Sequence, residues 1–293
     1  PTGRAIFGTS LRLSWLHRNF AHLPLQLFYD PNVLERHAWA YILYLLGRIL
    51  FPDSSGDTVS LMFLPILTDL YDVDTYSWGS GTKAWLYRSL CKACHRGVSQ
   101  IDGNLLLLQL WAWEQFPIKP PLPFDDFHFQ YPLFDDNINP PLGACWVPKR
   151  AVPDLKNLGT LAQCQEKFDE LTEEQVIWTL YLDVRLDLAW YQYRRDSYIW
   201  RCIVPLISSH VEWHYPNRVV RQFGLVQHIP LPCDTDLTLH AYDLRGFPNT
   251  VWTDIHRQYI TQWNERHSHV IMAHRPAANY MEWYRSITCL WIA

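Results

Sequence analysis

The chain has 293 residues, of which 48% are hydrophobic and 18% are charged, and its formal net charge is −4. This apolar composition excludes a disordered chain and supplies a large core, whereas the negative charge excludes a polycation that binds nucleic acid through its overall charge. No apolar run reaches the ~18 residues that span a bilayer, and no signal peptide is recognisable. We therefore expect an intracellular protein without a membrane segment.

The N-terminal part of the sequence is typical of a run of helices. Asp30 followed by Pro31 has the pattern of an N-cap and a proline in the first turn, and predicts a helix that ends before Pro52. Three more helices are expected, over residues 61–70, 80–97 and 102–116. Pro65 should kink the first of these, and Gly97 has the position of a glycine that closes the second.

Residues 117–153 differ from both flanking regions, because they contain nine of the 20 prolines together with closely spaced aromatic residues. Aromatic residues at this density argue against a free linker, so we predict an ordered, irregular connection. The chain is thereby divided into a helical part, residues 1–116, the connecting segment, residues 117–153, and a mixed α/β part, residues 154–293. We expect the three parts to form one continuous domain.

The C-terminal part mixes helical and strand patterns. Helices are expected over residues 155–171, 216–223, 252–263 and 280–291, and strand-like apolar stretches occur at residues 176–181, 203–207 and 211–213. Pro216 should open the second helix, and Gly224 should close it. The predicted fold class is mainly α with a minor β component in the C-terminal half, built as a helical core plus an ordered proline-rich connection.

Cys91 and Cys94 belong to a Cys-x-x-Cys-His sequence, the form of covalent haem attachment and of half a zinc site. No second cysteine pair and no targeting segment accompany it. Cys91 and Cys94 also continue a helical spacing of three and four residues from Ala84 and Tyr87, so we predict that both are buried as small hydrophobic side chains and bind nothing. We expect no metal and no cofactor.

Catalytic motifs are absent from the sequence: it has neither a glycine-rich phosphate loop nor a nucleophile elbow. Asp183 and Asp187, four residues apart, have carboxylates that suit a divalent ion, and they leave a metal-dependent hydrolase as an alternative. We assign no catalytic residue and expect a protein that is not an enzyme.

Arginine and aromatic residues alternate between residues 190 and 221. In nucleic-acid-binding proteins, such arginines bind phosphates and such aromatic rings stack on bases. The same residues also stabilise folds through arginine–carboxylate and arginine–aromatic contacts. The candidate residues for binding a nucleic acid or a partner are Arg194, Arg195, Arg201, Trp213, His214, Arg218 and Arg221. In a protein-interaction module, Arg218 and Arg221 should pair with internal carboxylates such as Glu212, Asp183 or Asp187.

Five long blocks of the sequence resemble the plant mobile domain family. They are LRLSWL at residues 11–16, AYILYLLGRILFPDSSGDTVSLMFLPIL at 40–67, YSWGSGTKAWLYRSLCKAC at 76–94, IDGNLLLLQLWAWEQFP at 101–117 and VEWHYPNRVVRQFGLVQHIP at 211–230. The resemblance implies a nuclear protein, or a copy captured by a transposable element, that acts in transcriptional regulation, transposon silencing and meristem maintenance. It also implies nuclear protein partners, among them a protein phosphatase of the PP7 type.

The family is also labelled aminotransferase-like, but the sequence shows neither a recognisable Schiff-base lysine nor a phosphate cup for pyridoxal chemistry. The predicted function is therefore a non-enzymatic nuclear interaction module. The first alternative is a transposon-derived domain that binds nucleic acid through the arginine and aromatic residues. Family members usually carry a segment upstream of Leu11 that is missing here, and its loss should leave an exposed apolar patch on the helical part.

Overall fold

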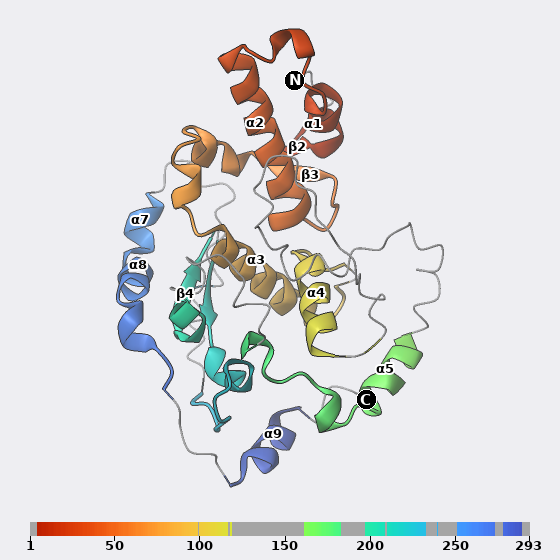
Figure 1. The fold of residues 1–293 in the computed structure, drawn as a ribbon, viewed down its shortest axis with the longest axis vertical. Coiled ribbons are helices and arrows are strands. Elements are labelled where there is room, and N and C mark those ends of the chain that lie inside the picture. The colour runs from red at the N-terminus through yellow and green to blue at the C-terminus, as the bar shows by residue number, and fades with distance from the viewer. Residues whose placement is uncertain are drawn as a thin grey trace. The chain divides into compact units, whose positions relative to one another are not determined.

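The computed structural model describes residues 5–98, 100–116, 118, 161–182, 197–208, 210–232, 239, 251–272 and 278–288. Figure 1 shows the chain coloured by residue number. The chain divides into two compact units, each drawn from three separate stretches of the sequence. Unit 1 is drawn from Pro1–Leu106, Val204–His214 and Asp234–Asn264, and unit 2 from Leu107–Ile203, Tyr215–Cys233 and Glu265–Ala293. The predicted division at residues 117–153 stays a prediction, since that segment lies outside the described residues except for Ile118.

Unit 1 begins with a small antiparallel sheet in the order β1 (Ile6–Phe7), β2 (Ser10–Arg12) and β3 (Thr58–Ser60). Leu11 of β2 lies opposite Ile6 on one side and Val59 on the other. Helix α1 (Leu13–Phe20) follows β2 directly. This sheet adds β structure to the half of the chain for which the sequence predicted helices alone.

Helix α2 (Pro31–Leu45) confirms the predicted start, because the Asp30 side chain accepts a hydrogen bond from the Asn32 backbone N–H at 3.0 Å. The helix continues as a π-helical turn, η2 (Leu46–Leu50), before Pro52. Gly47 in this turn allows η2 to approach β3 closely, since a Cβ atom at this position would overlap the Cβ of Val59.

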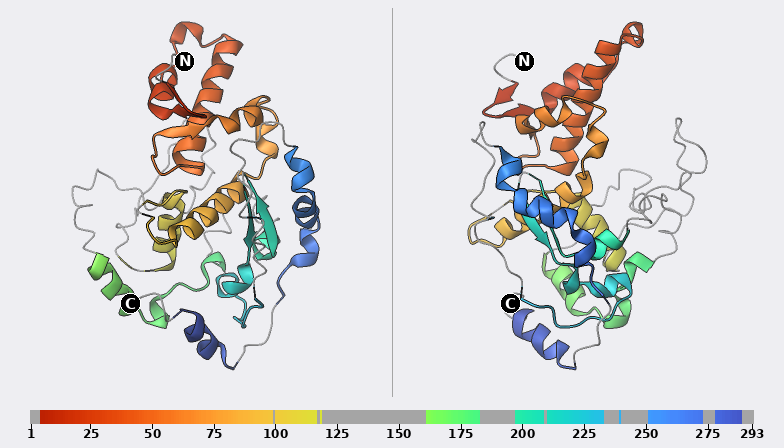
Figure 2. Two further views of the ribbon diagram at one scale, coloured as in Figure 1. Left: turned by 180° about the vertical axis from the view of Figure 1, so that it is seen from behind. Right: turned by 90° about the vertical axis from the view of Figure 1, so that its left-hand side faces the viewer.

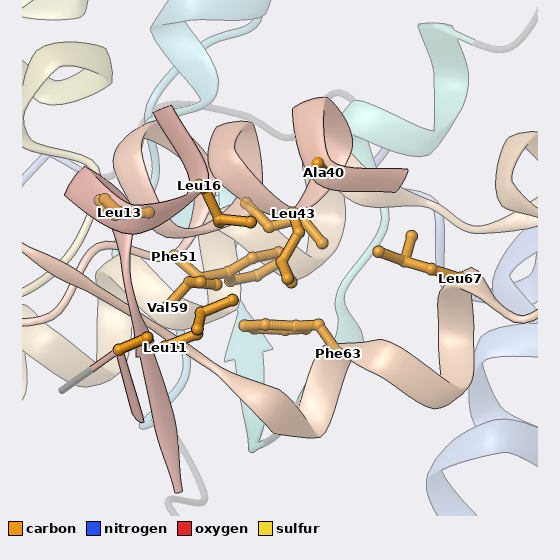
Figure 3. Close-up of a cluster of buried hydrophobic side chains, with 11 residues drawn as sticks. Leu11, Leu13, Leu16, Ala40, Leu43, Phe51, Val59, Phe63 and Leu67 are labelled. Carbon is orange, nitrogen blue, oxygen red and sulfur yellow. The ribbon is translucent and has the colours of Figure 1, made fainter. Parts of the chain in front are cut away.

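The main core of unit 1 is formed by side chains from the sheet, from α1 and α2, and from the 3-10 helix η3 (Leu61–Leu67) (Figure 3). Its labelled members are Leu11, Leu13, Leu16, Ala40, Leu43, Phe51, Val59, Phe63 and Leu67. The rings of Phe51 and Phe63 stack with centroids 5.0 Å apart. Pro65 lies inside η3, so the predicted helix over residues 61–70 is present as a shorter 3-10 helix.

The second half of unit 1 is an antiparallel hairpin of β4 (Val204–Ile207) and β5 (Val211–His214), which pair from Val204 opposite His214 to Ile207 opposite Val211. The hairpin lies between helices α3 (Trp78–Ala93) and α8 (Arg257–Asn264), as two views show (Figure 1, Figure 2). Val211, Leu239 and Tyr259 form a small core beside it. The two apolar stretches at residues 203–207 and 211–213 are therefore strands, as predicted.

Unit 2 is built mostly of short helices. Its described elements, with helix α4 that enters it at Leu107, are α4 (Leu105–Gln115), α5 (Leu161–Asp169), η7 (Glu173–Gln175), η8 (Leu180–Leu182), η10 (Ser197–Arg201), η11 (Pro216–Arg218), η12 (Val220–Phe223), η14 (Arg266–His269) and α9 (Tyr280–Thr288). Aromatic contacts hold η8 to its neighbours. The Tyr181 ring stacks on that of Phe223 with centroids 5.0 Å apart, and its centroid lies 5.4 Å from that of Trp200. In unit 1, the short helices η1 (Leu25–Leu27), η4 (Val73–Thr75) and α7 (Trp252–Ile255) complete the described elements.

The predicted fold class, mainly α with a minor β component, is confirmed. The strand expected at residues 176–181 is wrong, because this stretch turns into η8 and no described strand pairs with it. β-Propensity reflects packing on a sheet, so a strand-like composition without a neighbouring strand does not form one. The helix expected over residues 216–223 is two 3-10 helices divided at Val219, and Gly224 closes the second with φ of 71°.

Boundaries of the other predicted helices shift. The helix over 252–263 is divided at His256 into α7 and α8, and the one over 80–97 ends at Ala93, before Gly97. Phe7, Phe28 and Tyr29 of unit 1 are exposed, and the expected role of an upstream segment in covering an apolar patch stays a prediction. Among the described helices, none is both long and apolar enough to cross a bilayer.

Candidate functional site

A buried ion pair joins helix α3 to the hairpin of unit 1. The Arg88 Nε lies 2.6 Å from the Glu212 Oε1, and the two side chains are 7% and 9% exposed. The Arg88 Nη2 also donates to the backbone carbonyl of Leu239 at 3.0 Å. Since each buried charge has a partner, this pair fixes strand β5 against α3 without leaving an isolated charge in the core.

Aromatic and histidine side chains make further contacts between α3 and the hairpin. The Trp85 ring stacks on His210 with centroids 5.6 Å apart, and its Nε1 donates to the Pro52 carbonyl at 3.1 Å. The Tyr87 hydroxyl lies 3.5 Å from the Nδ1 of His214. His214, a predicted binding residue, is thus buried between α3 and β5 and does not face a ligand at the surface.

Lys83 is a second cation on α3. Its ammonium lies 5.6 Å from the centroid of the Tyr87 ring, and burial lowers the pKa of Lys83 from 10.5 to about 8. No carboxylate in the described part of the chain forms an ion pair with it. A fraction of the Lys83 side chains is therefore uncharged near physiological pH. Separately, the described residues contain no group of three His, Cys, Asp or Glu side chains placed to hold a metal.

Cys91 and Cys94 are both exposed, so the prediction that they are buried is wrong. The buried face of α3 is formed by residues up to Arg88 and Ser89, whereas the last turn of the helix leaves the packed region. Although Cys91 is exposed as a residue, partial burial of its thiol raises the pKa of that group, with a smaller contribution from Glu212. The helical spacing correctly placed Cys91 in the last turn of α3, which Cys94 follows as the C-cap, but it did not indicate where the packing of the helix ends.

An arginine–aromatic cluster lies in unit 2, where we define the Arg221 cluster as Glu173, Trp178, Arg218, Arg221 and Tyr280. The Arg221 Nη1 donates to the Glu173 Oε1 at 2.8 Å, and the guanidinium lies 4.2 Å above the centroid of the Trp178 ring. The Trp178 Nε1 in turn donates to the Glu173 carbonyl at 3.0 Å. Arginine, carboxylate and indole therefore hold one another in place.

Helix α9 contributes Tyr280 to the Arg221 cluster. Burial and then the neighbouring Tyr284 raise the pKa of Tyr280, while the positive charges of Arg221 and Arg218 oppose this rise. Arg218 is exposed and Arg221 is partly exposed. The cluster therefore presents cationic and aromatic groups to solvent, the combination that is enriched at binding hot spots.

The structure brings only part of the predicted site together. Arg218 and Arg221 lie in the Arg221 cluster, whereas Trp213 and His214 belong to strand β5 of unit 1. Arg201 is half-buried at the end of η10, where its carbonyl accepts a hydrogen bond from Ile271. The predicted residues Arg194 and Arg195 lie outside the described residues, as do Asp183 and Asp187.

Sequence reasoning missed three of the residues that make these contacts: Arg88, Glu173 and Trp178. A signal for Arg88 was present, because it lies four residues after Ala84 on the stripe of α3 that was predicted to be buried, and a buried arginine requires a carboxylate partner. A signal for Glu173 lay in the capping box formed by Thr172 and Gln175, which places Glu173 in the first turn of η7. Nothing local indicated Trp178.

The sequence is similar to the plant mobile domain over residues 3–285. It is 40% identical to the Arabidopsis thaliana serine/threonine-protein phosphatase 7 long form homolog, over 98% of this chain and 22% of that protein. It is also 28% identical to Protein MAIN-LIKE 2 and 26% identical to Protein MAINTENANCE OF MERISTEMS of the same plant, which it covers over 42% and 56% of their lengths.

The chain thus spans from about a fifth to little more than half of the length of these relatives, while each match covers 98% of the chain itself. No solved structure matches the chain. The domain match extends through both units and includes the buried ion pair as well as the Arg221 cluster. On this evidence the chain belongs to the plant mobile domain family.

Proposed function

We propose that this chain is a non-enzymatic protein-interaction module of the nucleus that acts in transcriptional regulation, transposon silencing and meristem maintenance. The membership of the plant mobile domain family and the name of the relative MAINTENANCE OF MERISTEMS support this assignment. The carboxylates of the hydrolase alternative, Asp183 and Asp187, lie outside the described residues.

One observation carries the choice between binding protein and binding nucleic acid: Arg221 is engaged by Glu173 and Trp178. The Glu173 carboxylate, 2.8 Å from the Arg221 guanidinium, offsets the positive charge that would attract a phosphate. The net charge of −4 supplies no long-range attraction for nucleic acid. An ordered arginine stacked on an indole instead suits a protein partner, because little side-chain entropy remains to be lost on binding.

The partner that we propose for the Arg221 cluster is a protein phosphatase of the PP7 type. The relative named as a phosphatase 7 long form homolog supports this proposal, since the region similar to this chain makes up 22% of that protein. The domain is part of a protein named as a phosphatase homolog and also of relatives that are not so named. We therefore expect the separate domain to retain a surface that binds the phosphatase.

The test measures binding of the purified chain to the catalytic domain of a PP7-type phosphatase by calorimetry. We expect Arg221→Ala and Trp178→Ala each to weaken the complex by about tenfold or more, a loss typical of hot-spot residues. The matched control is Arg257→Ala, which removes an exposed ion pair with Asp254 that has no cation–π partner among the described residues. If both cluster variants bind like the unsubstituted chain, the assignment of this surface is wrong.

A second candidate function, binding of nucleic acid, is favoured by the exposure of Arg218 next to Arg221. It is tested by fluorescence anisotropy with labelled single-stranded RNA and duplex DNA at low salt. We expect no saturable binding. Binding that weakens with salt, and whose salt slope falls by about one for each arginine replaced at Arg218 and Arg221, would replace the proposal.

A further inference from the structure

A groove in unit 2 is separate from the Arg221 cluster. It has a volume of about 430 Å³, within the range of ~300–1,000 Å³ that is usual for ligand pockets. Six of the residues that line it are Ile203, Asn217, His228, Leu231, Val270 and Met272. Leu231 and Met272 are 81% and 70% exposed, so the mouth of the groove is apolar.

The wall of the groove is held by Gln227, which lies between the two 3-10 helices and the following chain. Its Nε2 donates to the carbonyls of Asn217, at 2.9 Å, and of His228, at 3.0 Å. Its Oε1 accepts from the backbone N–H of Val220 at 3.2 Å. Three hydrogen bonds to one side chain fix the backbone that carries Asn217 and His228, so the groove is preformed.

Asn217 supplies the first unsatisfied group. The residue is only 7% exposed, and its side-chain Oδ1 has no hydrogen-bond partner among the described residues. A buried acceptor without a donor lowers the stability of the folded protein, because its hydrogen bond with water is lost and not replaced. Asn217 lines the groove, so a ligand bound there could donate an N–H to this oxygen. Such a ligand would explain why the folded protein keeps an acceptor without an internal donor.

Val270 supplies the second unsatisfied group, from its backbone. Residues 201–203 and 269–271 form an antiparallel bridge in which Ile203 N–H donates to His269 C=O at 3.0 Å and Ile271 N–H to Arg201 C=O at 2.9 Å. In such a ladder, the residue between the two hydrogen bonds points its own N–H and C=O away from the partner strand. Val270 is that residue, its backbone is extended, and neither group has a partner among the described residues.

We propose that this groove binds an extended peptide segment of a partner protein, which pairs as a strand with Val270, donates an N–H to Asn217 Oδ1 and packs an apolar side chain against Leu231 and Met272. An N–H and a C=O spaced as in a strand are matched by another peptide backbone, which is how peptides add to exposed sheet edges. The net charge of the chain plays no part in this recognition, since the lining residues include no Asp, Glu, Lys or Arg.

This inference goes beyond the proposed function, because it assigns a second site that does not include the Arg221 cluster. The test begins with a phage-displayed library of random peptides selected on the whole purified chain. Enriched peptides are then synthesised, and their affinities are measured by fluorescence anisotropy. We expect enriched sequences to contain apolar residues in an alternating pattern.

Two variants test the contacts. Asn217→Leu should weaken the selected peptides by about tenfold or more and leave the midpoint of urea unfolding unchanged or higher, because the lost oxygen has no internal partner. Met272→Glu should weaken them similarly by placing a charge at the apolar mouth. Met281→Glu is the matched control, since Met281 is also exposed in unit 2 but does not line the groove, and it should bind like the unsubstituted chain.

Methylation of the peptide backbone tests the strand pairing directly. N-Methylation of one amide at a time should abolish binding at alternate positions only, because alternate N–H groups face the protein. The proposal is overturned if no peptide is enriched, if Asn217→Leu and Met272→Glu bind like the unsubstituted chain, or if methylation has no effect at any position. Arg221→Ala should leave peptide affinity unchanged, so failure of the phosphatase assignment is distinguished from failure of this one.

Discussion

Each unit contains an arginine–glutamate pair, and the two pairs differ in what surrounds them. Arg88 and Glu212 in unit 1 lie 2.6 Å apart with side chains 7% and 9% exposed, whereas Arg221 and Glu173 in unit 2 lie 2.8 Å apart with side chains 39% and 67% exposed. The distances are nearly equal, so the surroundings decide what each pair does. A buried pair holds two elements together, and an exposed one leaves its groups available to a partner.

The physical reason is the cost of removing charge from water. Attraction between Arg88 and Glu212 is strong in the interior, but it offsets a desolvation cost of several kcal/mol for each ion, so the pair contributes specificity of packing more than net stability. The exposed pair has little desolvation cost and correspondingly little attraction, and the stacking of Arg221 on Trp178 supplies part of its order. These differences predict distinct responses to substitution.

The largest effect is expected for Glu212→Leu. It leaves the Arg88 charge buried without a counter-ion, and it should lower the free energy of unfolding by about 3–5 kcal/mol. The double variant Arg88→Met with Glu212→Leu should recover most of this loss, because no buried charge remains. Urea unfolding followed by tryptophan fluorescence measures both. A loss below about 1 kcal/mol for the single variant would show that the pair is not buried in solution.

The next largest effect on stability concerns Lys83, a half-buried cation of unit 1 that forms no ion pair with a described carboxylate. Because its pKa falls from 10.5 to about 8 on folding, charging it disfavours the folded state below pH 8. Lys83→Met should therefore stabilise the protein at pH 7, on the order of 1–3 kcal/mol.

This stabilisation has a defined pH window. Between pH 8 and 10.5 the folded protein loses the Lys83 proton while the unfolded chain still binds it, so the stability of the unsubstituted protein rises with pH relative to the variant. The difference between the two unfolding free energies, measured at several pH values, should shrink across this window. A difference that is constant from pH 7 to 10.5 would contradict the lowered pKa.

A smaller effect is expected for the exposed pair of unit 2. Arg221→Ala should lower the free energy of unfolding by about 1 kcal/mol or less, combining a surface ion pair with a surface cation–π contact. Arg221→Lys keeps the charge but loses the planar stacking, so its cost should be intermediate. If Arg221→Ala lowers the free energy of unfolding as much as Glu212→Leu does, burial does not distinguish the two ion pairs.

The smallest effect on stability is expected for the exposed cysteines next to the buried pair. Replacing Cys91 and Cys94 by Ala should change the free energy of unfolding by less than about 1 kcal/mol, as for other surface substitutions. In the folded protein both should react with a thiol reagent, whereas the buried Cys202 should react only on unfolding. Because Glu212 contributes to the raised pKa of Cys91, labelling of that thiol should also be faster in a folded variant that lacks this carboxylate.

Local signals in the sequence predicted the parts of the fold that depend on neighbours along the chain. The cap at Asp30 starts α2, Gly224 ends η12 in a left-handed conformation, and the apolar stretches around Val204 and Val211 are strands. Candidate site residues were predicted less well. Arg218 and Arg221 lie together in the Arg221 cluster, whereas Trp213 and His214 pack inside unit 1, and a binding role for these residues stays a prediction.

Caps, prolines and hydrophobic spacing act within a few residues, so they were enough to predict the fold class and most helix starts. The family was recognisable from the resemblance of five long blocks of sequence. Only the tertiary structure decided which carboxylate each arginine meets: Arg88 pairs with a residue 124 positions away, and Arg221 with one 48 positions away. It also decided that Cys91 is exposed and that residues 176–181 form no strand. These outcomes depend on where another element ends or packs, and no spacing along a single segment contains that information.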